Sequence, residues 1–202
     1  MIDARDWAIG QGITAPGKVA ILGSSYGGYA TLAALAFTPD AFACGVDLAG
    51  PTNLNTLLAT IPPHWFPQIA QFHKRMGDPG TAEGKAMLDA RSPLNAADKI
   101  AKPLPIGQGD NDPRVKQAEA DQIVAAMKAK GIPVTYLLAT DEGHGFQRPE
   151  DNLAFFGVAE QFLGKCLGGR AEPLGDVMTR SSIKVVAGGE WIVHSSAIAA
   201  VK

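Results

Sequence analysis

Serine, aspartate and histidine, the residue types of a catalytic triad, occur in this chain at the ends of separate predicted strands. The serine is Ser25, the centre of Gly23-Ser24-Ser25-Tyr26-Gly27, which matches G-x-S-x-G. In that motif a sharp strand-to-helix turn exposes the hydroxyl, and flanking glycines let neighbouring backbone approach closely. Small residues also form such turns without any chemistry, so the motif makes Ser25 a candidate nucleophile and leaves Ser24 as the variable position.

A serine hydroxyl needs a base to activate it at neutral pH. The chain has four histidines, and only His144, in "DEGHGF", follows a predicted strand end. Its flanking glycines suit a loop that turns the imidazole back over a sheet. His64 and His73 lie in an irregular, proline-rich region and are interpreted as surface or pocket-lining groups, whereas His194 lies in the C-terminal segment.

The base in turn needs an acid that orients it. Asp110 and Asp112 follow another predicted strand in "PIGQGDND", and both could also be plain turn residues, since aspartate favours turns. With either one, the chain order is serine, aspartate, histidine. That order is the one expected of α/β-hydrolases.

The predicted elements that must position these residues alternate along the chain. Strands are expected at 18–23, 43–50, 102–109 and 133–140, and the clearest helices at 3–10, 28–37, 115–130 and 149–167. Strands that alternate with helices pair in parallel through right-handed crossovers. We therefore predict an α/β fold with a mostly parallel sheet of about four strands, whose ligands bind beyond the carboxyl ends of the strands.

Composition excludes several classes of function. The 202 residues carry a net charge of −2, which gives no indication of nucleic-acid binding or of an acidic membrane surface. No apolar run could span a membrane, and the charged start "MIDARDWAIGQG" has no signal core, so we expect a cytoplasmic chain. No metal-ligand spacing occurs, and no cofactor is expected. Cys44 and Cys166 are expected to be buried as small hydrophobic residues and not to form a disulfide.

The motifs "GSSYGGYATL", "GDNDPRV" and "DEGHGF" resemble the catalytic domain of the prolyl oligopeptidase family of serine peptidases, over about residues 3–187. The resemblance implies an α/β-hydrolase fold and cleavage of short peptides. It implies Ser25 as the nucleophile, Asp112 in place of Asp110 as the acid, and His144 as the base. It further implies Arg114 as an anchor for a substrate carbonyl and Val115 near the specificity pocket.

In this scheme Ser25 attacks the carbonyl carbon, His144 transfers the proton, and Asp112 orients His144. The backbone N–H of Tyr26, at the predicted helix start, donates to the oxyanion. The apolar and aromatic stretch at 54–72 either lines the pocket or simply packs against the domain.

The chain departs from the family pattern before the nucleophile strand. Only residues 1–18 precede that strand, whereas family members carry earlier strands, a β-propeller and a second oxyanion donor there. We expect residues 1–175 to be a partial hydrolase domain, from a longer enzyme or a truncated gene product. We expect 176–202 to be an extended tail with one short strand near 183–186. Residues 18–23 would then form an exposed sheet edge that favours self-association. A small-molecule esterase and a catalytically silent fragment are the alternatives to a peptidase.

Overall fold

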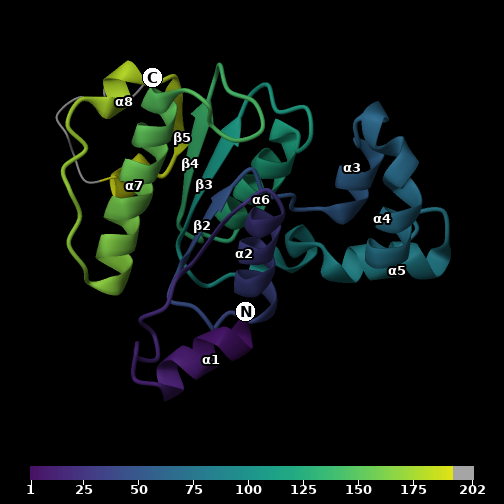
Figure 1. The fold of residues 1–202 in the computed structure, drawn as a ribbon, viewed down its shortest axis with the longest axis horizontal. Coiled ribbons are helices and arrows are strands. Elements are labelled where there is room, and N and C mark those ends of the chain that lie inside the picture. The colour runs from purple at the N-terminus through teal and green to yellow at the C-terminus, as the bar shows by residue number, and fades with distance from the viewer. Residues whose placement is uncertain (193–202) are drawn as a thin grey trace.

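A sheet of five strands forms the middle layer of the protein, whose computed structural model describes residues 1–192 (Figure 1). In both chain order and spatial order the strands are β1 (Ile21–Ser24), β2 (Gly45–Leu48), β3 (Leu104–Gly109), β4 (Val134–Ala139) and β5 (Ile183–Ala187). Strands β1 to β4 are parallel, and β5 runs antiparallel to β4. The prediction of a mostly parallel α/β sheet is confirmed.

Helices cover both faces of this sheet (Figure 1). Helices α2 (Tyr26–Phe37) and α6 (Gln117–Ala129) pack on one face, and α7 (Pro149–Leu167) packs on the other. Strands β2 and β3 are buried along their whole length, as expected for parallel strands covered on both sides. Leu35 lies in the core under α2, and Phe155 lies in the core under α7. The helices packed on the two faces hold the strands in place, and so fix where the carboxyl ends of the strands lie.

A helical excursion between β2 and β3 projects to one side of the sheet (Figure 1). Its elements are α3 (Leu54–Ala59), η1 (Pro63–Gln68), α4 (Ile69–Met76), α5 (Ala82–Arg91) and η2 (Pro93–Lys99). We call residues 54–91 the arm. The arm has a small core of its own, formed by Leu54, Leu58, Ile61 and Leu88. It therefore packs as a separate unit, and its position depends on how its base is attached.

The N-terminal helix α1 (Ile2–Gly10) lies below the sheet in Figure 1, at the end opposite the carboxyl ends of β3 and β4. None of its residues is buried. The Arg5 guanidinium donates to the carbonyl of Ala41 over 2.8 Å and so holds α1 against the loop that leads to β2. This helix stabilises the base of the domain and contributes nothing to the carboxyl end of the sheet.

The segment after α7 does not form an extended tail, in contrast to the prediction for 176–202. Helix α8 (Val177–Arg180) packs Met178 into the core under α7, and β5 adds Ile183 to the same core. A short 3₁₀ turn, η3 (Gly189–Trp191), follows. The weak sequence pattern here reflects an edge strand with alternating burial, which carries fewer apolar residues than a central strand. The rest of the predicted tail lies outside the described residues.

The prediction for the two cysteines is wrong, because Cys44 and Cys166 form a disulfide. Cys44 lies just before β2 and Cys166 lies in the last turn of α7, and the fold brings their Cα atoms to 6.6 Å. That approach depends on how α7 crosses the sheet. No local sequence pattern indicates it, since the two residues are 122 positions apart.

Strand β1 is the edge of the sheet within the described residues, as the sequence predicts for 18–23. It pairs with β2 alone, and Leu22 on β1 is 49% exposed. A groove of about 390 Å³ runs between Leu22 and α7, where Phe156 and Leu163 line it. The edge is therefore an open row of backbone groups beside an apolar groove.

Within residues 1–192, no helix is both long and apolar enough to cross a membrane. The same part of the chain holds no group of three or more histidine, cysteine or acidic side chains placed to bind a metal ion.

Candidate active site

The candidate nucleophile lies on a strained turn between β1 and α2. Ser25 has φ 58° and ψ −118°, a left-handed backbone that few residues other than glycine adopt. A Cβ on Gly23 would lie 2.2 Å from the backbone of Gly27, so position 23 accepts only glycine. The N–H of Ser25 donates to the carbonyl of Leu48 over 2.8 Å and fixes the turn to β2. The first glycine of G-x-S-x-G is thus explained by close backbone contact at the turn, whereas a Cβ on Gly27 would meet nothing within 4 Å.

Three side chains from separate loops meet above the carboxyl end of the sheet. The Oγ of Ser25 lies 2.8 Å from Nε2 of His144, and Nδ1 of His144 lies 2.7 Å from Oδ2 of Asp112. The other oxygen of Asp112, Oδ1, accepts from the backbone N–H groups of Arg114 at 2.8 Å and Val115 at 2.9 Å. Asp112 is buried and His144 is 15% exposed. The acid is held on one side by backbone and faces the imidazole on the other.

This chain of hydrogen bonds can activate a hydroxyl group. An imidazole that faces a carboxylate through Nδ1 presents Nε2 as a proton acceptor, and the carboxylate stabilises the imidazolium that forms. A serine Oγ within hydrogen-bond reach of that nitrogen can lose its proton as it attacks an electrophile. The geometry therefore suits acyl transfer through a covalent intermediate.

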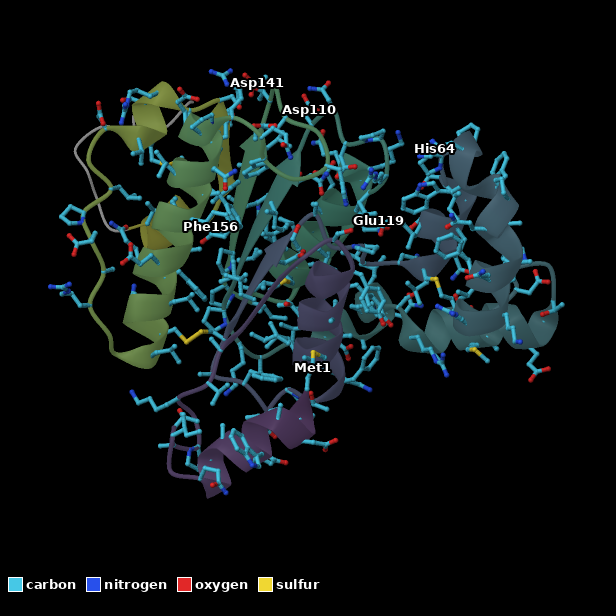
Figure 2. All side chains as sticks on the ribbon, viewed as in Figure 1. Met1, His64, Asp110, Glu119, Asp141 and Phe156 are labelled. Atoms are coloured by element: carbon cyan, nitrogen blue, oxygen red, sulfur yellow. A yellow bond between two sulfur atoms is a disulfide. The ribbon has the colours of Figure 1, made fainter. Side chains whose placement is uncertain are left out.

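Other residues weighed at the sequence level lie elsewhere. Asp110 is exposed at the end of β3, and Figure 2 shows it near Asp141, at the end of the sheet from which the loops after β3 and β4 emerge. Figure 2 places His64 on the arm, where it packs edge-on against Trp65. Nδ1 of His73, also on the arm, lies 3.4 Å from Oδ1 of Asp78. Residue 194 lies outside the described part of the chain.

Tyr26 begins α2, where backbone N–H groups have no partner inside the helix. Its amide directly follows the Ser25 nucleophile position, and its side chain is exposed. Val115 is buried beneath the loop that carries Asp112, and its carbonyl accepts from the Gln108 side chain over 3.0 Å. Val115 therefore supports this loop.

Arg114 is exposed and points toward the arm. Its guanidinium carbon lies 5.7 Å from the centre of the Trp65 ring, within the range of a cation–π contact. Trp65 in turn stacks on Phe72, with ring centres 5.8 Å apart. The stretch at 54–72 was expected either to line the pocket or to pack against the domain, and the pairing of Trp65 with Arg114 was not predicted. The contact depends on the orientation of the arm, which no motif in the sequence encodes.

A buried glutamate attaches the base of the arm to α6. Oε2 of Glu119 accepts from the backbone N–H groups of Thr52 and Asn53, both at 2.8 Å. The hydroxyl of Thr56, in the first turn of α3, donates to Oε1 of the same side chain. Figure 2 labels Glu119 between the sheet and the arm. Sequence analysis did not single out Glu119, which looks like any polar helix residue in the sequence.

Asp47 lies beneath the first turn of α2 and is 1% exposed. Its two oxygens have no hydrogen-bond partner among the described residues, although a Cβ on Gly28 or Gly50 would collide with its Oδ1. Burial raises the pKa of this carboxyl to about 8, because the charged form loses its hydration. The folded protein thus keeps a proton here that the unfolded chain releases near pH 4, so rising pH opposes folding.

Comparisons with known proteins agree with the fold. The sequence profile of the prolyl oligopeptidase family matches residues 1–170. Dipeptidyl aminopeptidase BIII of Pseudoxanthomonas mexicana is 64% identical over 192 residues, which are 95% of this chain and 28% of that protein. Dipeptidyl peptidase family member 6 of Caenorhabditis elegans is 51% identical over 174 residues, 86% of this chain and 24% of that protein. The chain thus spans about a quarter of the length of these relatives.

Two solved structures are similar to this chain in fold. A puromycin-hydrolyzing peptidase of Mycobacterium tuberculosis has a TM-score of 0.70 and 30% sequence identity, over 85% of this chain and 25% of that one. A puromycin hydrolase has a TM-score of 0.77 at 23% identity, over 86% of this chain and 26% of that one. The second likeness supports the fold alone.

Proposed function

The chain belongs to the prolyl oligopeptidase family, and we propose that it carries the nucleophile, base and acid of a serine peptidase that cleaves short peptides. The observation that carries this proposal is the continuous set of hydrogen bonds from Ser25 through His144 to Asp112. No cofactor or metal ion is needed for this chemistry, because the hydroxyl, the imidazole and the carboxylate supply nucleophile, base and orienting group.

The proposed reaction has two stages. In the first, Oγ of Ser25 bonds to the peptide carbonyl carbon while His144 takes the hydroxyl proton, and the backbone N–H of Tyr26 donates to the oxyanion. The C–N bond then breaks, and His144 returns the proton to the leaving amine. In the second stage, water attacks the acyl-serine ester, with His144 again as the base, and releases the acid and free Ser25.

Two lines of support point to peptides as substrates. The backbone of Arg114 contacts Asp112, and its exposed guanidinium lies over the Trp65 ring of the arm, from where it can donate to the backbone carbonyl of a substrate. The relatives that are 64% and 51% identical bear the names of dipeptidyl peptidases. We therefore propose that Arg114 anchors the peptide on its acyl side, next to the Trp65 ring.

The test is turnover of a peptide anilide by variants of two neighbouring serines. Ser25→Ala should lower turnover by several orders of magnitude, since loss of the nucleophile leaves only binding and oxyanion contacts. Ser24→Ala is the matched control, because it removes an exposed hydroxyl one residue earlier and should leave turnover unchanged. Equal turnover by both variants would contradict the proposal.

The esterase alternative uses the same three residues, so substrate preference must separate it from the peptidase. A peptidase that holds a backbone carbonyl through Arg114 should prefer a peptide anilide with at least two residues over the anilide of a single acyl group. An esterase should hydrolyse a simple acyl ester and show no gain from the added peptide unit.

We further infer that the 202-residue chain by itself self-associates through β1. One side of this strand offers unpaired N–H and C=O groups next to the apolar groove along α7. Size-exclusion chromatography should show oligomers. Amide exchange should protect Leu22 and Ser24, whose N–H groups face away from β2, only as concentration rises. A monodisperse monomer with protected amides there would refute this inference. A monomer without turnover would favour the silent-fragment alternative.

The cytoplasmic location expected from the N-terminal sequence stays a prediction, and the disulfide argues against it. Disulfides form and persist mainly in oxidising compartments. Thiol alkylation in denaturant directly after cell lysis separates the two cases, since Cys44 is buried in the folded protein. Rapid modification of Cys44 and Cys166 would support a reducing compartment, and full resistance would support an oxidising one.

A further inference from the structure

The base of the loop that carries His144 is closed by the buried side chain of Glu142 and by an exposed ion pair between Arg148 and Asp141. Residues 140–148, which we call the histidine loop, connect β4 to α7. Oε1 of Glu142 accepts from the backbone N–H of Gln147 over 2.9 Å and from the N–H of Arg148 over 2.6 Å. These donors follow His144 in the chain, whereas Glu142 precedes it. The side chain therefore spans the loop and fixes the distance between the two ends of the segment that presents the imidazole.

The same residue also contacts the loop that carries the acid. The backbone carbonyl of Glu142 accepts from the N–H of Asn111 over 3.0 Å, one residue before Asp112. A second link joins the two loops, because the Asn111 side chain donates to the carbonyl of Thr140 over 3.1 Å. Glu142 is thus connected through its backbone to the Asp112 loop and through its side chain to the far end of the histidine loop.

The Glu142 side chain is buried, at 3% exposure, whereas Gln147 and Arg148 are exposed residues. Without this carboxylate their backbone N–H groups would lose the acceptor that ties them to the start of the histidine loop. Three other contacts also hold the loop: Phe146 packs edge-on against Phe155 with ring centres 5.5 Å apart, a β-bridge joins Gly143 to Gly145, and Arg148 pairs with Asp141 at the surface. None of these supplies an acceptor for the N–H groups of Gln147 and Arg148. The segment around His144 would therefore shift relative to Asp112 and Ser25 when the Glu142 side chain is removed.

We propose that Glu142 is a positioning residue for His144, an inference that rests on the proposed function. It does not touch the reacting atoms. It holds the histidine loop so that Nδ1 meets Asp112 and Nε2 meets Ser25 at the distances seen here. A misplacement of about 1 Å can cost about 10²-fold in rate. We expect Glu142→Ala to lower kcat by about 10- to 100-fold with little change in KM.

Two further variants separate the effect of side-chain length at position 142 from the effect of its charge. Glu142→Gln keeps the length and one acceptor oxygen but removes the charge, and it should retain most of the activity. Glu142→Asp keeps the charge but is one methylene too short to reach the same amides, and it should lose activity much as Glu142→Ala does. The matched control is Glu150→Ala, an exposed glutamate whose Oε2 lies 3.9 Å from Nε of Arg148, and it should behave like the wild type.

The experiment uses the 202-residue chain and two readouts. The first is the second-order rate of phosphonylation by a fluorophosphonate probe. The second is the NMR resonance of the proton between Nδ1 of His144 and Asp112, which reports the geometry whether or not the chain turns over substrate. We expect a slowed reaction and a lost or shifted resonance in Glu142→Ala and Glu142→Asp. Glu142→Gln and Glu150→Ala should keep the wild-type signal.

The outcomes distinguish this inference from the proposed function. A wild-type chain that shows the resonance but does not react with the probe would count against the peptidase, and the resonance in the variants would still test Glu142. A wild-type resonance and rate in Glu142→Ala would overturn the positioning role. Loss in Glu142→Gln together with retention in Glu142→Asp would also overturn it, because charge and not reach would then be the property that matters.

Discussion

The disulfide between Cys44 and Cys166 should contribute a large part of the stability of this chain. We consider the variant Cys44→Ala/Cys166→Ala, which removes the bond without leaving a free thiol. Both sulfur atoms belong to the core between α7 and the sheet, so the bond ties the start of β2 to the end of the longest helix. Its loss frees the unfolded chain from a closed loop of 122 residues.

The size of the effect follows from the entropy of that loop. In the chain-entropy model the constraint on a loop with a sequence separation of 122 is worth about 4.9 kcal/mol at 25 °C. Domains of this size have unfolding free energies of about 5–15 kcal/mol, so the loss is a substantial fraction of the total. At about 2–4 °C per kcal/mol, the melting temperature should fall by about 10–20 °C.

Urea unfolding followed by circular dichroism measures the change. Reductant should lower the urea midpoint of the wild type toward that of the double variant. It should leave the midpoint of the double variant unchanged, and this comparison controls for the alanine substitutions. A loss below about 1 kcal/mol, or two titratable thiols in the native wild-type protein, would refute the reasoning.

Three further predictions concern single side chains. Asp112→Asn should lower turnover by about 10⁴ with little effect on folding, because the amide favours the wrong imidazole tautomer, and a larger loss from Asp110→Asn would contradict the choice of acid. Arg114→Ala should raise KM for peptide anilides and spare simple esters, and equal losses on both substrates would argue against a peptide anchor. Asp47→Asn should flatten the fall in unfolding free energy that we expect of the wild type between about pH 4 and 8, because the folded wild type keeps a proton that the unfolded chain releases. A wild-type slope in that variant, measured by denaturant titration at each pH, would show that Asp47 ionises normally.

Local sequence patterns were sufficient to predict the layers and the candidate catalytic residues. The parallel strands and their helices follow from apolar runs and breaker residues, and the G-x-S-x-G motif marks the turn at Ser25. Parallel strands end at one edge of a sheet, so residues that follow β1, β3 and β4 must gather there. That rule brings Ser25 and His144 together with the Asp110–Asp112 loop without knowledge of any side-chain contact, and the family resemblance indicated Asp112 as the acid.

Features that depend on the packing of distant segments could not be predicted. The disulfide requires the end of α7 to cross the start of β2, and the Arg114–Trp65 contact requires a particular orientation of the arm. The role proposed for Glu142 depends on hydrogen bonds to amides five and six positions later. Strand β5 was only weakly indicated, since an antiparallel edge strand exposes alternate residues and lacks a continuous apolar run.

The most direct test of the proposed mechanism is the site of covalent modification by a fluorophosphonate probe, found by intact mass and peptide mapping. The proposal predicts one adduct per chain, located on Ser25, with no adduct in Ser25→Ala and a strongly slowed reaction in His144→Ala. An adduct on Ser24, or undiminished labelling of Ser25→Ala, would contradict the assignment of Ser25 as the activated nucleophile.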